Sequence, residues 1–448
     1  MFLYLVPVKI VDDLLGVIVD IRGVKGLIVE EIAKSLNKSI KELSSIINHY
    51  LIKEIGERIE ISSGFVDGSN VFDERRGSII VLLSAYGLIV RGSNGNIRMH
   101  NVIGANGARK PIAIILFPRI YAETRIGILM RTLELLVARS IINQDVESVF
   151  LDGSYLSMLL APSGAARQSY KLLIEDLPEQ LVKEVEDIVS KRLRELYLKL
   201  DRIEYSNPYE GFMNIIDIMP EEYSSIINDL LSVLENKKPI EKVIDYSLLA
   251  IDENIGFYQL TKLLDESLRK NVRVYWIAKD TDSRFLARVN RLSTWITDVS
   301  LLDHLWANEN IVALRVNDLV DLESISAWRT TRWMGQGSEL VFEPLRALEF
   351  YSKWGKFDVW YFKLTRYGPV LQLTYPQRYG REAGIEALGV LRNLSDPKTG
   401  YPKPLILVHH ATRLEERLAE GLGDTIWSRL ENPLLKVLLA RRARLRLL

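Results

Sequence analysis

Two apolar, β-branched runs in this chain end in the same tripeptide, Asp-Gly-Ser. The first run is RIEISSGFVDGS at residues 58–69, and the second is VESVFLDGS at residues 146–154. Runs of this kind predict buried strands, although a single Asp-Gly-Ser often marks only a turn with a helix N-cap. In open α/β sheets, functional sites gather at the carboxyl ends of parallel strands. If the two strands are parallel neighbours, we expect Asp67 and Asp152 to meet at one edge of a sheet.

The segment between these runs predicts a hairpin followed by a long helix. Apolar stretches at 78–92 and 95–105 are joined by GSNGN, which is a hairpin turn signal. Residues 122–143 have apolar side chains at helical spacing, and Glu134 lies beside the apolar stripe. A carboxylate there is costly to bury without a partner. That partner is either a metal ion or Arg131, one turn earlier.

Three carboxylates, those of Asp67, Glu134 and Asp152, would then converge on one point. Carboxylates so placed repel one another strongly, and a divalent cation would neutralise them. The chain has no cysteine and 5 histidines, so any metal must be held mainly by carboxylates, which suits Mg²⁺ or Mn²⁺. Two ions roughly 3.5–4 Å apart would promote hydrolysis of a phosphodiester, with the carboxylates holding ions rather than attacking.

The order of these motifs resembles that of the archaeal NurA nuclease family, whose fold is ribonuclease H-like. The resemblance rests on FVDGS, RTLELL and VFLDGSYL in the first half of the chain. It also rests on VYWIAKDTDSRFL at 274–286 and GYPKPLILVHHATRL at 400–414. Together these motifs cover roughly residues 58–160 and 270–415, and their shared order makes the resemblance more specific than any one of them.

The resemblance implies a set of metal ligands. Asp67, Glu134 and Asp152 would hold Mn²⁺, or Mg²⁺, with two ions in each site. His409 would be a further ligand or a proton shuttle, because its charge changes near neutral pH. Glu123 competes with Glu134 for the helical position, but a carboxylate at a helix start is already explained by the helix dipole.

The resemblance also implies two residues that meet the substrate. Tyr401 would stack on a base or contact a phosphate, unless its ring lies in the core. Lys279 would bind the scissile phosphate as a point charge. The alternative for Lys279 is a surface ion pair with Asp280 or Asp282.

We therefore expect an α/β protein with a ribonuclease H-like mixed sheet flanked by helices. The predicted segments are an N-terminal helical part at 1–57, a first half of the core at 58–164, a helical insertion at 165–270, and a second half with a C-terminal helix at 271–448. The N-terminal helices fit either a helix-turn-helix or an ordinary helical hairpin.

The family implies a metal-dependent DNA nuclease that processes ends for recombinational repair. Such proteins are 5′→3′ exonucleases on single- and double-stranded DNA and endonucleases on single strands. They work with HerA, a hexameric ATPase translocase, and form homodimers with a channel for DNA. The chain contains no GxxxxGK[ST] loop, which fits a nuclease that depends on a separate motor.

The charge balance leaves room for a local nucleic-acid surface. Lys and Arg number 58, and Asp and Glu number 58, which disfavours a non-specific polycation. Local basic stretches occur at 327–337 and 438–448, although each also fits a solvated surface. Trp328, Trp333 and Trp354 would either stack on bases or pack in the core.

Two other classes of function stay open. One is a ribonuclease H-fold protein that acts on RNA or guide duplexes, and the other is a non-enzymatic structural subunit. A separation above about 10 Å between Asp67 and Asp152 would exclude a shared metal pair. No apolar run reaches the roughly 20 residues of a membrane span, and the N-terminus does not read as a signal peptide. We therefore expect a cytoplasmic protein without a membrane segment.

Overall fold

A computed structural model describes most of the chain. The described residues are 40–58, 60–93, 96–102, 111–160, 164–234, 237–279, 281–289, 296–322 and 341–441. Most of the expected N-terminal helical part, the basic stretch at 327–337 with its two tryptophans, and the tail after residue 441 lie outside this set. Within it, residues 40–48 are helical.

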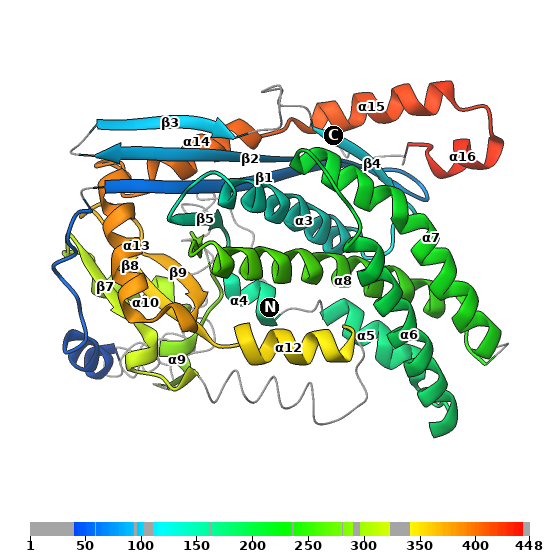
Figure 1. Ribbon diagram of the computed structural model, residues 1–448, viewed down its shortest axis with the longest axis horizontal. Coiled ribbons are helices and arrows are strands. Elements are labelled where there is room, and N and C mark those ends of the chain that lie inside the picture. The colour runs from blue at the N-terminus through cyan, green and yellow to red at the C-terminus, as the bar shows by residue number, and fades with distance from the viewer. Residues whose placement is uncertain are drawn as a thin grey trace, which may run out of the picture.

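A mixed sheet of nine strands forms the centre of the described structure (Figure 1). Its path runs β3-β2-β1-β5-β6-β9-β8-β7, and β4 pairs with β2 beside this path. β5 is parallel to both β1 and β6, and the other pairs are antiparallel. The strands are β1 Glu60–Glu74, β2 Ile79–Ser93, β3 Asn96–Val102, β4 Ile112–Leu116, β5 Ser148–Asp152, β6 Arg273–Ala278, β7 Val312–Arg315, β8 Phe357–Lys363 and β9 Leu371–Pro376.

The first Asp-Gly-Ser strand differs from the expectation. We expected it to end at Asp67 in a glycine turn, and that expectation is wrong. β1 continues to Glu74, because β2 pairs with it along its whole length, from Glu60 opposite Ser93 to Glu74 opposite Ile79. The second strand, β5, does end at Asp152.

Helices cover both faces of the sheet. α3 packs against β1 and β2, and α8 runs beside α3 (Figure 1). On the opposite face, α14 and α15 pack against β1 and β2. The helices are α3 Ala122–Ile142, α4 Tyr155–Leu160, α5 Gly164–Ile174, α6 Glu179–Leu200, α7 Pro208–Leu234, α8 Ile240–Arg269, α9 Phe285–Val289, α10 Asp298–Leu305, α12 Pro344–Trp354, α13 Arg381–Leu394, α14 Lys403–Thr412, α15 Glu416–Arg429 and α16 Pro433–Leu438.

Each face of the sheet has its own apolar core. The core on the α3 and α8 side includes Val66 and also takes in side chains of α5 to α8. The core on the α13 and α14 side includes Phe65, Phe150 and Tyr275, whose rings stack across three strands at centroid distances of 5.1 Å. Because side chains alternate along a strand, Asp67 follows Phe65 onto the α14 side and Gly68 follows Val66 onto the α3 side.

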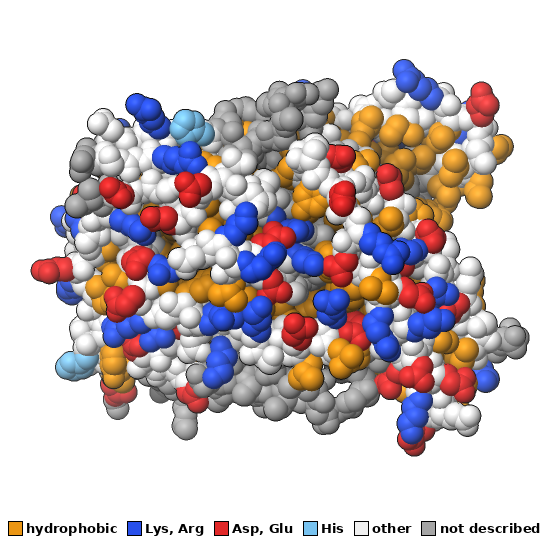
Figure 2. All heavy atoms as spheres, in the orientation of Figure 1, with side chains coloured by type: hydrophobic (Ala, Val, Ile, Leu, Met, Phe, Trp, Pro, Cys, Tyr) orange, Lys and Arg blue, Asp and Glu red, His pale blue; other side chains and the backbone are white. Residues whose placement is uncertain are grey.

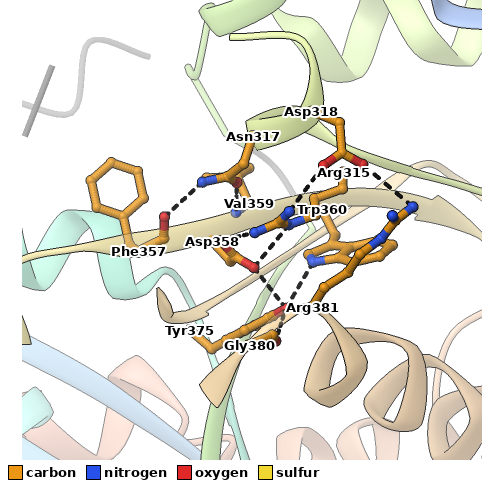
Figure 3. Close-up of polar contacts among 10 residues, drawn as sticks. All are labelled: Arg315, Asn317, Asp318, Phe357, Asp358, Val359, Trp360, Tyr375, Gly380 and Arg381. Atoms are coloured by element: carbon orange, nitrogen blue, oxygen red, sulfur yellow. Dashed lines mark hydrogen bonds and ion pairs between the residues drawn. The ribbon is translucent and has the colours of Figure 1, made fainter. Parts of the chain in front are cut away.

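A buried polar network fixes the far end of the sheet (Figure 3). Asp358 of β8 is fully buried and accepts hydrogen bonds from Arg315 at 2.9 and 3.0 Å. The Tyr375 hydroxyl of β9 also donates to it at 3.0 Å. Asp318 pairs with Arg315 at 2.9 Å and with Arg381 of α13 at 3.5 Å. Since a buried charge is stable only when paired, this network holds β7, β8, β9 and α13 together.

The helices of the described residues are short or polar relative to a membrane span. None of them is both long and apolar enough to cross a bilayer.

Candidate metal centre

Asp67 and Asp152 are brought together by strand register. Val66 of β1 lies opposite Leu151 of β5 in a parallel pair, so the next residue of each strand is an aspartate. Both side chains point to the α14 face. Asp67 is 6% exposed, whereas the Asp152 side chain is 18% exposed. The two carboxylates therefore meet at the carboxyl end of β5, as expected for parallel neighbours.

His409 joins the two aspartates from α14. Its Nδ1 atom lies 2.9 Å from Oδ2 of Asp67, which is hydrogen-bonding distance. One ligand atom from each of Asp67, Asp152 and His409 lies within 4.8 Å of the other two. The His409 side chain is 54% exposed, so the group is open to solvent on this side. Pairing of His409 with Asp67 leaves His410 as a neighbour, with a ring-centroid distance of 6.1 Å.

The electrostatics of Asp67 show the cost of this arrangement. Burial raises the pKa of the Asp67 carboxyl, and the neighbouring Asp152 charge raises it further. The hydrogen bond from His409 and the charges of His409 and Lys279 act in the opposite direction. Burial and the repulsion from Asp152 outweigh these opposing contributions, so the folded chain disfavours the ionised form of the Asp67 carboxyl.

Glu134 reaches the cluster from the other face of the sheet. It lies on α3, is 5% exposed, and contacts the backbone of Gly68. A Cβ atom at Gly68 would overlap the Glu134 carboxylate, so glycine is required here for the helix to approach β1. Glu134 is not among the three residues whose ligand atoms lie within 4.8 Å of one another. The structure therefore places it beside the Asp67–Asp152–His409 group rather than within it.

The Glu134 carboxyl is held in an environment that disfavours its charge. Burial, followed by the charges of Asp67 and Asp152, raises the pKa of Glu134 to about 8. The Arg131 charge and the Gly68 backbone oppose this shift. Arg131 donates instead to the carbonyl of Gly127 at 3.2 Å, and no ion pair to Glu134 forms among the described residues. The simple pairing with Arg131 that the sequence left open is thus not made.

Lys279 and Tyr401 complete the surroundings. Lys279 Nζ lies 2.7 Å from Oδ2 of Asp152 and 4.7 Å from the centre of the Tyr401 ring. The alternative partner Asp282 is not used, and Asp280 lies outside the described residues. Tyr401 is 8% exposed, and burial raises its pKa, with the Asp152 and Asp67 charges adding to the effect. Its hydroxyl lies near Asp152 but makes no hydrogen bond of ordinary geometry to the described residues.

Other predicted site residues lie elsewhere. Glu123 is exposed in the first turn of α3, away from the carboxylate group. Trp354 is 1% exposed, and its indole N–H donates to Asp265 at 3.1 Å, so it is a core residue and cannot stack on a base. Sequence reasoning missed the part played by Gly68, which was taken for a turn residue. The available signal was Glu134 beside the apolar stripe of a long helix, since a buried carboxylate needs a small residue opposite it.

The residues present fit a divalent cation. Two carboxylates and an imidazole form a donor set that suits a hard or borderline ion such as Mn²⁺ or Mg²⁺. Among the described residues, Lys279 is the one lysine or arginine that forms an ion pair with Asp67, Glu134 or Asp152. His409 adds a positive charge only when protonated. The pKa values of Asp67 and Glu134 are raised by burial and by neighbouring negative charges, which is expected of carboxyls whose charge a bound cation would balance.

The fold matches solved structures of known proteins. The NurA nuclease from Sulfolobus solfataricus aligns with a TM-score of 0.52 at 16% identity, over 95% of this chain and 99% of that chain. A NurA structure bound to dAMP and manganese aligns with a TM-score of 0.55 at 15% identity, over 91% of this chain and 96% of that one. The class is therefore an α/β protein with the mixed, helix-flanked sheet of the NurA structures.

Sequence comparison finds similarity to NurA proteins over part of the chain. Residues 254–414 match the family model for the NurA domain. The "DNA double-strand break repair nuclease NurA" of Sulfolobus acidocaldarius is 31% identical over 130 residues, which are 29% of this chain and 35% of that protein. Residues 254–414 are therefore similar to the NurA domain, and the wider chain resembles NurA proteins in fold. The matched stretch spans about a third of the curated relative, and the family-model match contains Lys279, Tyr401 and His409 but not Asp67, Glu134 or Asp152.

Proposed function

We propose that this protein is a metal-dependent nuclease that hydrolyses phosphodiester bonds of DNA during double-strand break repair. The observation that carries the proposal is the group formed by Asp67, Asp152 and His409, whose ligand atoms lie within 4.8 Å of one another at the end of β5. A separation above 10 Å, which would have excluded a shared ion, is not found. The names of the relatives, a repair nuclease and a manganese-bound NurA, support the same function.

Each residue of the group has a distinct task in this proposal. Asp67, Asp152 and His409 hold the ion, and Asp67 is itself oriented by its contact with His409. The ion, when bound, acts as a Lewis acid on a phosphate oxygen and favours deprotonation of a water. Lys279 leaves Asp152 to contact the scissile phosphate, as its position over the Tyr401 ring allows. No side chain here forms a covalent bond to the substrate.

The finer features follow the resemblance to the family. We propose Mn²⁺ as the preferred ion, with Mg²⁺ as a substitute, and Glu134 as a ligand for a second ion. The Glu134 carboxylate lies against Gly68, the residue that follows Asp67. The raised pKa of Glu134 supports a role in which a cation balances its charge. We also propose 5′→3′ exonuclease activity on single- and double-stranded DNA and endonuclease activity on single strands. A ribonuclease H-like origin of the sheet fits the antiparallel β3-β2-β1 and parallel β1-β5-β6 pairing.

Substitution of the aspartates tests the proposal. Asp67→Ala and Asp152→Ala should each lower Mn²⁺-dependent cleavage of single-stranded DNA by more than about 100-fold, because loss of even an outer-shell partner costs roughly 10–100-fold. Glu123→Ala removes an exposed carboxylate of α3 and serves as the matched control. Retained activity in both aspartate variants would place the chemistry elsewhere. An RNA of the same sequence, assayed in parallel, separates a deoxyribonuclease from a protein that acts on RNA.

The partner proposals concern a separate surface. We propose a homodimer that works with a hexameric HerA-type ATPase, and the chain has no phosphate-binding loop of its own. Hydrophobic side chains gather over α15 and α16, at the upper right of Figure 2. These exposed residues are Leu418, Trp427, Leu434, Leu435 and Val437. Such a patch supports contact with another protein chain.

A charge placed on this surface tests the partner proposals. Leu434→Asp, on a side chain that is 67% exposed, should disrupt either self-association or complex formation with the ATPase while leaving Mn²⁺ binding intact. Leu198→Asp changes a comparably exposed leucine of α6 and is the control. An unchanged sedimentation profile, alone and with the ATPase, would move both interfaces away from α15 and α16.

A further inference from the structure

The loop between β8 and β9 presents an aromatic ring to solvent. Tyr367 is 82% exposed, which is the largest exposure among the large hydrophobic side chains of the described residues. The Arg366 guanidinium lies 5.9 Å from the centre of its ring. Exposing a tyrosine so fully contributes nothing to the core, and its neighbour is a cation rather than an apolar group. The ring and the guanidinium are therefore both accessible to a ligand from solvent.

Strand register places this loop at the edge of the sheet that carries the metal centre. β9 is antiparallel to β6, with Ala278 opposite Gln372. The start of β9 therefore lies beside the end of β6, where Lys279 follows Ala278. On the other side of β6, Asp152 of β5 lies opposite Ile277. The β8–β9 loop and the carboxyl ends of β5 and β6 thus share one end of the sheet.

A direct contact joins the loop to the segment that leads into Tyr401. Gly368, next to Tyr367, packs on Gly400, and a Cβ built on Gly368 would lie 2.9 Å from the Gly400 Cα atom. Gly400 immediately precedes Tyr401, whose ring lies against Lys279. The backbone between these glycines leaves no room for an intervening side chain. The loop backbone next to Tyr367 therefore lies against the segment that leads into Tyr401.

We propose that Tyr367 is a stacking platform for a nucleobase of a single strand that enters the metal centre, with Arg366 pairing to an adjacent phosphate. A base stacks on an exposed ring regardless of its identity, and a guanidinium beside the ring contacts the backbone. The inference rests on the proposed nuclease function and names the way in which the site holds its substrate.

The test uses the full chain and an oligodeoxythymidylate that carries one 2-aminopurine, with Ca²⁺ in place of Mn²⁺ for binding. Tyr367→Ala should bind about tenfold more weakly than the wild type, which corresponds to about 1.4 kcal/mol. Tyr367→Phe and Tyr367→Trp should bind like the wild type, because they keep a ring. In Mn²⁺, Tyr367→Ala should raise KM about tenfold and leave kcat unchanged, since the residue is remote from the reacting atoms.

The fluorescence of 2-aminopurine reports stacking itself. Its quenching on binding should be lost in Tyr367→Ala and retained in Tyr367→Phe. Tyr50→Ala removes another exposed tyrosine, 42% exposed and near edge strand β7, and should change neither affinity nor quenching. Wild-type affinity and quenching in Tyr367→Ala would overturn the inference, as would a Tyr367→Phe variant as weak as Tyr367→Ala.

The same experiment separates the inference from the proposed function. The wild type could bind the strand and quench its fluorescence through Tyr367 but cleave no DNA with any divalent ion. This result would refute the proposed nuclease function and leave the stacking role of Tyr367 standing. A wild type that cleaves DNA with KM unaffected in Tyr367→Ala would refute the platform and keep the nuclease. A wild type that neither binds nor cleaves would refute both.

Discussion

The two Asp-Gly-Ser segments are alike in sequence but differ in backbone and partners. Asp67-Gly68-Ser69 lies in the middle of β1, which continues to Glu74 in full pairing with β2. Asp152-Gly153-Ser154 lies where β5 ends, and Gly153 has a φ of +121°. The first glycine makes room for a helix, and the second reverses the chain. The same tripeptide thus places a carboxylate at one site from two different backbone conformations, a continuous strand and a strand end.

The two aspartates also differ in what balances their charge. Asp67 is paired with the imidazole of His409 from α14, while Asp152 is paired with the ammonium of Lys279 that follows β6. An imidazole is itself a metal ligand, whereas an ammonium competes with a metal for the carboxylate. In the proposed function, His409 is therefore a ligand of the ion, and Lys279 pairs with Asp152 until an ion or a phosphate replaces one of the partners.

Among substitutions that leave both aspartates in place, the largest effect is expected from Gly68→Ala. The new Cβ would overlap the Glu134 carboxylate, so either α3 or the side chain must move. Activity with Mn²⁺ should fall by more than about 10-fold, as for a lost outer-shell partner. Single-turnover cleavage of single-stranded DNA measures this. If Gly68→Ala cleaved as fast as the wild type, Glu134 would have no part in the site.

The next largest effects should have opposite signs. His409→Ala should weaken Mn²⁺ binding about tenfold, since a ligand is lost. Lys279→Met should tighten it, because the competing ammonium is removed, yet should slow cleavage. Isothermal titration at neutral pH gives both affinities. Equal weakening in the two variants would mean that Lys279 supports the ion site rather than competing with it.

The pH dependence of stability should reveal the buried carboxyl of Glu134. Its pKa is raised from 4.5 to about 8, so the folded chain binds more protons than the unfolded chain between these values. Its contribution to the free energy of unfolding is therefore greatest below pH 4.5 and is lost as the pH rises toward 8. Glu134→Gln should remove this decline, a gain of about 2–4 kcal/mol at pH 8 without metal.

Urea unfolding of the wild type and of Glu134→Gln, each in EDTA at several pH values, measures this difference. Glu123→Gln changes an exposed carboxylate of the same helix and should leave the decline in place. Parallel curves for the wild type and Glu134→Gln would show that Glu134 is ionised in the folded chain without an ion.

The smallest effect is expected from Gly153→Ala. No atom lies within 4 Å of the new Cβ, so only the strained φ matters. Unfolding should become easier by about 1–2 kcal/mol, with Mn²⁺ affinity changed by less than about twofold. Thermal unfolding and titration check the two parts. A loss of ion binding as large as that of Gly68→Ala would remove the distinction between the two glycines.

Much of the site follows from local patterns. The runs before Asp67 and Asp152 and the spacing on the long helix are periodic signals, and they predicted the strands and α3. The late segment with Tyr401 and His409 was found only through the resemblance to a family, because neither residue stands in a local pattern that marks a site. The pairing of Lys279 with Asp152 could not be predicted, since it depends on how β6 aligns with β5.

The loop that carries Tyr367 had no signal in the sequence. TRYGPV between two strands is typical of any hairpin connection. The position of this loop near the metal centre depends on the antiparallel pairing of β9 with β6 and on the contact of Gly368 with Gly400. Both join residues far apart in the chain.

The sequence by itself determined that two carboxylates follow buried apolar runs and that a third lies on an amphipathic helix, because hydrophobic periodicity is a local property of the chain. Only the tertiary structure decided that Asp67 stands within a strand, that Glu134 approaches through the space left by Gly68, and that His409 rather than an arginine meets Asp67. Those outcomes depend on strand register and helix packing, which are set by contacts between distant residues.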